Sequence, residues 1–478
     1  MRALEALFLL SVFYAGCTST GLNLAVRILH INTATAGSPS LPSSSATSRF
    51  PLYGTAEYAK VCPWVGSVAD SAPAAKDCSI LLRPDPIFNN EGVSWWATEA
   101  AYGMIMSRLI GCDLLLDYMP DVKIGDILKQ PRGRTKATWA TSSNYTCTAS
   151  RRCYLIDRPK CRDEEGIAEL RDKMLEEGIG RELVRIPQYR FGYYSQLSAK
   201  MSKWKLYHED YRQLAEAIPN FDLQTGHSCA LTSLFELNED RAGMYEPELF
   251  SHILPTLRDE NNLVITLYYR SNYADSRARA EKEGKDFVEG MRSPQSAVKG
   301  VIECALGREE EFLSRRNHVG ETGERTKLDK DERTSDFQSI VWLVVSDSVT
   351  VKEWIADEFS GNNTNARIAK NQQRYPGKVI PRHVLTTTAR GVHTRAKRKT
   401  STTDFAEAMI DWWLIGESDV VVSSGSMSFG ETAALRTQRP IYLIQNHQCS
   451  RYNLILPPRD NSTSKEGADN AKKPRIRL

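Results

Sequence analysis

The feature that most constrains the fold of this chain is a series of short apolar runs separated by segments with helical spacing. The apolar runs are DLLLDY at 113–118, LVITLYY at 263–269, SIVWLVVSD at 339–347, DVVVSS at 419–424 and PIYLI at 440–444. Helices are predicted between them, over 293–315, 350–359, 403–416 and 429–437. Strands that are apolar along their whole length are buried on both faces, so the pattern predicts an α/β protein with parallel sheets covered by helices.

The length of 478 residues is about three times the usual size of a single domain, so we expect two packed domains. Hydrophobic residues make up 41% and charged residues 25%, which is typical of a folded globular protein. The formal net charge is only +3, and this balance gives no reason to expect a nucleic-acid partner. The two predicted domains are residues 56–260 and residues 261–457.

The N-terminal region has the pattern of a targeting segment. Arg2 precedes an apolar run over 6–15, so residues 1–24 are predicted to be a signal peptide or a short signal anchor in a membrane. A buried strand over 7–13 is the alternative. The Ser-, Thr- and Pro-rich stretch that follows predicts a flexible stem over 25–55.

Two further polar stretches are expected outside the folded core. The run 317–336 is predicted to be a surface loop, and residues 458–478 a disordered tail.

The cysteine pattern favours disulfides over a metal site. The chain has 10 cysteines, and no two have the C-x-x-C spacing of a zinc or thioredoxin motif. Cys147, Cys153 and Cys161 lie close together, and at least one of them is expected to form a local bridge. The glycosylation sequons at Asn144, Asn362 and Asn461 agree with a glycosylated chain of the secretory pathway. The 8 histidines are scattered, so no metal site is predicted.

Polar side chains follow three of the predicted strands. Arg270 comes directly after LVITLYY, Asp347 ends SIVWLVVSD, and the loop SSGSMSFG at 423–430 follows DVVV. Ligands of doubly wound sheets bind at the carboxyl ends of the strands. A helix that begins near Ser428 directs its first backbone N–H groups outward and favours an anion such as a diphosphate. The alternative is that Ser426 or Ser428 only caps this helix.

The C-terminal half resembles a known donor-binding motif. The segment FAEAMIDWWLIGESDVVVSSGSMSFGETAALR resembles the corresponding motif of GDP-fucose-dependent fucosyltransferases, the superfamily of the alpha-1,6-, xyloglucan and protein O-fucosyltransferases. WLVVSDS at 342–348 and LYYRSN at 267–272 resemble two further strand ends of the family, and 91–118 resembles its N-terminal glycine loop and following strand. The family's His-x-Arg is here Tyr268-Tyr269-Arg270, and its glycine loop retains only Gly92.

The resemblance implies two Rossmann-like domains in the glycosyltransferase-B arrangement. Residues 56–260 would then bind the acceptor and 261–457 the nucleotide sugar. The implied reaction is an inverting transfer of fucose from GDP-fucose to a glycan or protein hydroxyl, without a metal cofactor. The expected location is the secretory pathway, in the Golgi lumen or membrane, or outside the cell as a secreted protein. The alternatives are a non-catalytic relative that binds glycan or nucleotide, and a transferase that uses another nucleotide sugar.

The resemblance also implies roles for individual residues. Arg270 would neutralise the leaving diphosphate with its planar fork of donors. Asp411 would accept hydrogen bonds from guanine or ribose, with Asp347 as a second such residue; a helix cap is the alternative for both aspartates. The remaining implied donor contacts are Ser426, Ser428, Phe429 and Gly430. His393 is a further candidate because it lies between the third and fourth C-terminal strands, with an ordinary histidine as the alternative.

The general base is the least defined of the expected groups. The family's carboxylate after the arginine is absent at the usual offset, and Asp275 is the nearest acid in this sequence. An ordinary turn aspartate is the alternative for Asp275. Trp412 and Trp413 have helical spacing beside Leu414 and are expected in the core rather than in a sugar site.

Overall fold

The structure is a computed structural model of the chain. It describes residues 50–65, 79–82, 92–94, 96–97, 100–101, 103–104, 113–116, 118, 122–131, 139–141, 153–155, 183–186, 223–271, 294–322, 337–360, 380–392, 394, 400–425, 428–445 and 448–452. All described residues belong to one compact unit of the chain, within residues 46–478.

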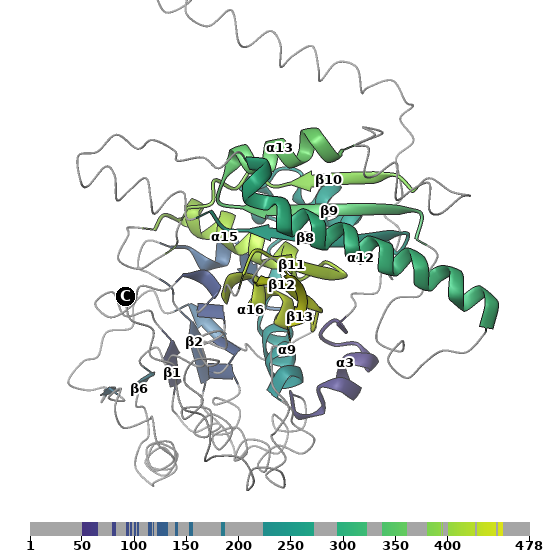
Figure 1. Cartoon of the computed structure of the whole chain (residues 1–478). Helices are drawn as coiled ribbons and strands as arrows, with labels where there is room; N and C mark the ends of the chain where they lie inside the picture. The colour runs from purple at the N-terminus through teal and green to yellow at the C-terminus, as the bar shows by residue number, and fades with distance from the viewer. Residues whose placement is uncertain are drawn as a thin grey trace, which may run out of the picture. The chain divides into compact units, whose positions relative to one another are not determined.

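The larger sheet is formed by the C-terminal half of the chain (Figure 1). Its strands are β8 (Asn262–Tyr269), β9 (Ser339–Ser346), β10 (Arg382–Thr386), β11 (Val420–Ser423), β12 (Ile441–Gln445) and β13 (Gln448–Tyr452). The strand order is β10-β9-β8-β11-β12-β13, and every pair is parallel except β12 with β13. The four apolar runs predicted in this half are therefore strands, and β10 and β13 are additional ones.

Both faces of this sheet are buried under helices, as the apolar runs predict. Alternate side chains of a strand point to opposite faces. Leu263, Ile265 and Leu267 of β8 pack in one core with α12 (Pro294–Thr322) and α13 (Val349–Phe359). Val264 and Tyr268 pack on the other face, in a core shared with α15 (Thr402–Ile415) and α16 (Ser428–Arg436). Figure 1 shows α12 running along the sheet as its longest covering helix.

The four predicted helices are confirmed, with one correction at an end. α12 continues to Thr322, so the prediction that a loop begins at 317 is wrong. No proline interrupts residues 317–322, so their polar sequence can continue the helix for further turns. Residues 323–336 lie outside the described part of the chain.

A smaller sheet comes from the N-terminal half and is parallel throughout. Its order is β4 (Trp139–Thr141), β2 (Asp113–Leu116), β1 (Ser79–Leu82), β6 (Leu183–Ile186) and β5 (Cys153–Leu155). The predicted strand at 113–118 is thus confirmed, ending two residues earlier. The molecule is an α/β protein dominated by parallel sheets, in agreement with the sequence.

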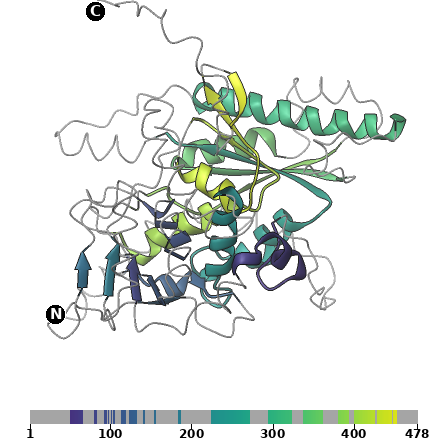
Figure 2. The same cartoon turned by 90° about the horizontal axis from the view of Figure 1, so that it is seen from below.

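The remaining described helices and strands lie outside the two sheets. They are α3 (Ala56–Val61), η1 (Ile124–Asp126), β3 (Leu128–Lys129), α9 (Leu223–Leu234), β7 (Glu236–Leu237), η4 (Ala242–Met244), η5 (Leu249–Ile253) and α10 (Leu254–Arg258). The strands β3 and β7 form a separate antiparallel pair. Helix α9, teal in Figure 2, lies beside α3 and packs against α16.

Residues from both halves of the chain share one hydrophobic core. Trp96 is fully buried, and its ring lies 5.8 Å from that of Phe405 on α15 and 5.4 Å from that of Phe235. Tyr118 lies 4.7 Å from Phe405 in the same cluster. Phe50 is buried in this core as well, so packed residues begin inside the segment 25–55 that the composition assigns to a stem.

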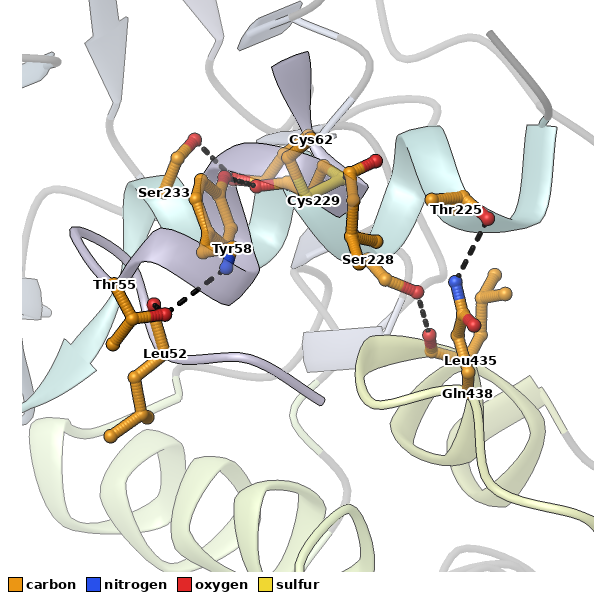
Figure 3. Close-up of a disulfide and its surroundings, with 12 residues drawn as sticks. Leu52, Thr55, Tyr58, Cys62, Thr225, Ser228, Cys229, Ser233, Leu435 and Gln438 are labelled. Carbon is orange, nitrogen blue, oxygen red and sulfur yellow. Dashed lines mark hydrogen bonds between the residues drawn. A yellow bond between two sulfur atoms is a disulfide. The ribbon is translucent and has the colours of Figure 1, made fainter. Parts of the chain in front are cut away.

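Disulfides are confirmed for two cysteine pairs, Cys62–Cys229 and Cys304–Cys449. The first joins α3 to α9 (Figure 3), where the Tyr58 hydroxyl also donates to the Cys229 carbonyl at 2.7 Å. Ser228 on α9 donates to the Leu435 carbonyl at 2.6 Å and so ties α9 to α16.

The remaining predictions for these regions are not tested by the structure. A local bridge among Cys147, Cys153 and Cys161 involves no described side chain. No helix among the residues listed above is long and apolar enough to cross a membrane. The predicted signal segment 1–24 and tail 458–478 lie outside the described residues.

Candidate functional site

A pocket opens at the carboxyl ends of β8 and β9, beside the first turn of α16. The strands β9 and β11 lie on opposite sides of β8, so the direction in which the chain adds strands reverses here. Such a switch point leaves a crevice at the strand ends, where doubly wound sheets bind ligands. The pocket is lined by Tyr268, Arg270, Val345, Ser346, Asp347, Ala389, Gly391, Val392, Glu407, Ala408, Asp411 and Phe429.

Tyr268 forms the floor beneath the first turn of α16. Its ring stacks on Phe429 with centroids 5.6 Å apart. A Cβ at Gly430 would lie 2.7 Å from the Tyr268 ring, so this glycine lets the helix approach the strand closely. Burial raises the pKa of Tyr268 to about 12, against the lowering effect of the nearby Arg270 charge and its hydrogen bond. The Tyr268 hydroxyl therefore stays protonated at neutral pH.

The chain turns sharply after β8, and Asp347 holds that turn. The Asp347 Oδ1 accepts hydrogen bonds from the backbone N–H of Ser271 at 2.6 Å and from its hydroxyl at 2.8 Å. The N–H of Arg270 donates to the Ser424 Oγ at 3.3 Å. These contacts fix the backbone of Arg270 between β9 and β11, while its side chain lines the pocket.

The two carboxylate oxygens of Asp347 differ in their surroundings. The Oδ2 atom is buried and has no hydrogen-bond partner within the described part of the chain. The cap of α13 is Ser348, whose side chain accepts from the Val351 N–H, so the alternative that Asp347 caps this helix is wrong. A buried polar atom without a partner costs free energy, which a ligand donor would offset.

Asp411 lies in the interior of α15, so the capping alternative is wrong for it too. Its carboxylate is 5% exposed and accepts a hydrogen bond from the Thr387 hydroxyl at 2.6 Å. Burial raises the pKa of Asp411 to about 6, although the Thr387 hydrogen bond and the charge of Lys352 lower it. At neutral pH the group is mainly ionised, but it is close to titration.

The segment 387–392 after β10 forms one wall of the pocket, and buried polar side chains hold it. The Thr388 N–H and hydroxyl both donate to the Glu246 Oε2, at 2.7 and 2.9 Å. The Lys352 Nζ donates to the Thr387 carbonyl at 2.9 Å and to the Ala389 carbonyl at 2.5 Å. The Arg390 N–H donates to the Glu407 Oε2 at 2.9 Å.

Gly391 lets this wall meet the strand end of β9. Its φ is +69°, in the left-handed region that favours glycine. An added Cβ would also overlap the backbone of Asp347, so a residue other than glycine would require the two segments to move apart.

The N-terminal half meets the same wall at Thr394. The Val93 N–H donates to the Thr394 Oγ1 at 3.1 Å, and the Tyr118 hydroxyl donates to the Thr394 carbonyl at 2.5 Å. A Cβ at Gly92 would lie 2.7 Å from the Thr394 Oγ1. The one glycine retained from the expected N-terminal loop therefore serves a close contact with the C-terminal half.

The structure brings Arg270, Asp347, Asp411 and Phe429 together around one pocket, as their strand-end and helix positions lead one to expect. Gly430 lies behind Tyr268 instead of at the pocket surface. Ser428 is the first residue of α16, and its side chain is not described. The other residues singled out in the sequence lie outside the described part: His393, Ser426, Asp275, Asn144, Asn362 and Asn461.

Four contributors to the site were not found from the sequence: Glu246, Lys352, Thr387 and Glu407. Glu246, Lys352 and Thr387 are ordinary charged or polar residues in a helix or loop with no motif around them, and Glu407 lies inside the donor-motif segment without being one of its distinctive residues. Within the described ranges no cluster of three or more His, Cys, Asp or Glu side chains is arranged to hold a metal ion. The expectation of a metal-free reaction remains a prediction.

The chemistry of the pocket suits a ligand with distinct anionic and hydrogen-bond-donating parts. Arg270 offers a cationic fork, Asp347 and Asp411 offer carboxylate acceptors, and Phe429 with Tyr268 offers an apolar surface.

Comparisons with known proteins give low similarity. No protein-family model and no curated protein matches the sequence at a significant level. Among solved structures, a mutant of Arabidopsis thaliana FUT1 in complex with GDP is 13% identical, with a TM-score of 0.41, covering 84% of this chain and 78% of that one. The fucosyltransferase NodZ from Bradyrhizobium is 10% identical, with a TM-score of 0.38, covering 78% of this chain and 98% of its own.

A third such structure is POFUT1 in complex with GDP-fucose, 9% identical, with a TM-score of 0.27, covering 77% of this chain and 96% of its own. All three are fucosyltransferases, the class that the sequence motifs resemble. At these TM-scores the likeness carries no argument about function.

Proposed function

We propose that this protein is a fucosyltransferase-like enzyme that transfers fucose from GDP-fucose to a glycan or protein hydroxyl with inversion. The observation that carries the proposal is the meeting of Arg270, Asp347 and Asp411 around one pocket at the switch point of the larger sheet. These are three of the residues that the donor-motif resemblance singles out. They come from two strand ends and a helix that are far apart in the sequence.

In the proposed reaction, the acceptor hydroxyl oxygen bonds to the anomeric carbon as the bond from that carbon to the β-phosphate oxygen breaks. GDP leaves with the bonding electron pair, and the hydroxyl proton passes to a base. Negative charge grows on the diphosphate, and Arg270 is placed to stabilise it with two parallel hydrogen bonds. Asp411 would accept from the N1 and N2 edge of guanine, which adenine does not offer.

The proposal also covers the domain arrangement and the identity of the general base. Two Rossmann-like domains in the glycosyltransferase-B arrangement fit the two parallel sheets, with 56–260 contributing the acceptor side and 261–457 the donor side. Asp275 stays the candidate base. No metal cofactor is required in this scheme, since Arg270 supplies the positive charge.

The proposed location is the secretory pathway, in the Golgi or as a secreted protein. The two disulfides support it, since such bonds persist in oxidising compartments. The N-terminal segment would act as signal or anchor.

Nucleotide selectivity tests the donor assignment. Thermal unfolding of the full chain is measured with GDP, ADP and UDP at equal concentration. GDP at one hundred times its dissociation constant should stabilise the protein by about 2.7 kcal/mol, and the other two should stabilise it far less. Asp411→Asn should narrow the difference between GDP and ADP. Equal shifts for all three nucleotides would refute the guanine assignment.

Turnover separates the enzyme from its alternatives. The protein is incubated with GDP-fucose and a mixed panel of glycan and glycoprotein acceptors, with and without EDTA. Product formation that EDTA leaves unchanged supports a metal-free transferase. GDP binding without turnover on any acceptor would favour a non-catalytic nucleotide-binding relative, and product formation only when another nucleotide sugar replaces GDP-fucose would favour a different donor.

A further inference from the structure

Lys352 is a buried lysine that contacts the pocket wall 387–392 from the side away from the pocket. It lies on α13, is 4% exposed, and does not line the pocket itself. Burying an ammonium group costs several kcal/mol unless it is well paired. Its Nζ donates to the carbonyls of Thr387 and Ala389, at 2.9 and 2.5 Å. Both carbonyls belong to the wall that follows β10.

These two hydrogen bonds act on Asp411 through Thr387. The Lys352 ammonium fixes the backbone of Thr387, and the Thr387 hydroxyl donates to the Asp411 Oδ1 at 2.6 Å. The second bond fixes Ala389, which lines the pocket two residues before Gly391. One side chain therefore holds both the Thr387 backbone beside the Asp411 carboxylate and the pocket wall 387–392.

Lys352 is also the positive charge that acts on Asp411. The charges of Glu246, on the segment before α10, and of Glu407, one turn away on α15, both oppose ionisation of Asp411, and Lys352 favours it. From β8 and β9 the same pocket is faced by Tyr268, Arg270 and Asp347. With burial and two like charges against it, the ionised form of the Asp411 carboxylate is stabilised by the Thr387 hydrogen bond and by the buried ammonium of Lys352.

We propose that Lys352 is a positioning residue of the donor pocket: it orients the Asp411 carboxylate through Thr387 and supplies the buried positive charge that keeps this carboxylate ionised. The proposal deepens the proposed function and rests on it for the identity of the ligand. The coupling between Lys352 and Asp411, however, is a property of the protein without ligand and is tested separately.

The first test measures the coupling without nucleotide. Because the pKa of Asp411 is raised in the folded protein, its contribution to stability is complete below the unfolded value near 4 and is lost as pH rises through about 6. The free energy of unfolding of the wild type, minus that of Asp411→Asn, should therefore fall over this range. When the same difference is measured in a Lys352→Met background, its fall should extend to a pH about one unit higher or more. The reason is that removal of the opposite charge raises the pKa of Asp411 further.

Two further variants separate charge from hydrogen bonding and guard against a misfolded Met variant. Lys352→Gln keeps a donor but has no charge, so the shift to higher pH should persist. Lys352→Arg keeps the charge, so the pH range should stay near that of the wild type. Lys299→Met, an exposed lysine on α12, is the matched control and should change nothing. An unchanged pH range in both the Met and Gln variants would overturn the proposal.

The second test measures binding of GDP-fucose by calorimetry between about pH 5.5 and 8.5. GDP-fucose is used instead of GDP because the terminal phosphate of GDP itself titrates near pH 6, which would obscure the titration of Asp411. In GDP-fucose that phosphate is esterified by the sugar. The Lys352→Met variant should bind about tenfold more weakly near pH 6.5, and its deficit should shrink as pH rises.

The two tests fail in different ways. A deficit that stays constant at all pH values would indicate only a structural role and would refute the charge coupling. Failure of the wild type to bind GDP-fucose at any pH would refute the proposed function, while the stability test would still decide on the coupling of Lys352 to Asp411.

Discussion

Arg270 is the residue on which the proposed chemistry most depends. Its backbone is fixed between β9 and β11 by contacts to Ser424 and, through Ser271, to Asp347. Removing a preorganised donor to a developing negative charge typically costs a hundredfold or more in rate. We expect Arg270→Ala to lower kcat about a hundredfold, and Arg270→Lys to recover only part of the loss, because lysine acts as a point charge without the bidentate fork.

The measurement is initial-rate kinetics with GDP-fucose, alongside thermal unfolding to confirm that the variants fold. Arg241→Ala is a suitable control, because Arg241 is 56% exposed and pairs with Asp126 at the surface. Exposed pairs of this kind contribute at most about 1 kcal/mol. Wild-type turnover in a folded Arg270→Ala variant would remove Arg270 from the reaction.

At the scale of elements, a charged triad centred on Glu417, just after α15, joins α10 and α16; Glu417 and Arg436 are buried, and Arg258 is partly exposed. The Glu417 carboxylate accepts from the Arg258 Nε at 3.1 Å and from an Arg436 nitrogen at 3.0 Å. The same Arg436 nitrogen donates to the Trp413 carbonyl, and the guanidinium lies 4.0 Å from the Trp413 ring centroid. Burial favours the neutral acid, but the two arginines outweigh it and lower the pKa of Glu417 to about 2.

We expect Glu417→Gln to destabilise the protein by about 3–5 kcal/mol at neutral pH, because Arg436 stays buried without its counter-charge. The lowered pKa means that this stabilisation is present above the ordinary glutamate value near 4.5 and is lost as pH falls toward 2. Thermal unfolding at a series of pH values checks both statements. The difference between wild type and variant should shrink in acid, and a difference that grows there would contradict the assignment.

Glu353→Gln is the matched control for this comparison. Glu353 is an exposed glutamate on α13, and its replacement should leave the unfolding free energy within about 0.5 kcal/mol of the wild type.

At the scale of the whole molecule, the two halves of the chain fold around a shared core. Trp96, Tyr118 and Phe235 pack against Phe405 of α15, and α9 is tied both to α3 by a disulfide and to α16 by Ser228. The face of the larger sheet that carries Val264 and Tyr268 belongs to this core. We therefore expect the full chain to unfold in a single calorimetric transition.

The fragment 261–457 provides the complementary experiment. Without the N-terminal segments, the apolar faces of α15 and α16 would be exposed, so the isolated fragment should aggregate or bind a hydrophobic dye. A soluble fragment that unfolds cooperatively, or two separate transitions in the full chain, would show that the halves are independent domains. In either of those cases the shared core would not be the main source of cooperativity.

The sequence alone determined β2, four strands of the larger sheet (β8, β9, β11 and β12), the helices α12, α13, α15 and α16, and the strand ends at which polar residues gather. Local periodicity is sufficient for this, because an apolar run of strand length between helical segments has few other ways to bury its backbone. The convergence of Arg270 and Asp347 was predictable as well, since the carboxyl ends of parallel strands meet at one edge of a sheet. Asp411 was found through its motif.

Tertiary structure alone decided which residues support these groups. Cys62 pairs with Cys229 across 167 positions, and no spacing rule specifies such a partner. Lys352, Glu246 and Gly391 carry no local signal that distinguishes them from ordinary helix or loop residues. Their roles arise because buried polar groups need hydrogen-bond partners, and the fold decides which groups lie close enough to pair. Periodicity can be recognised from neighbouring residues, whereas contacts between distant parts of the chain cannot.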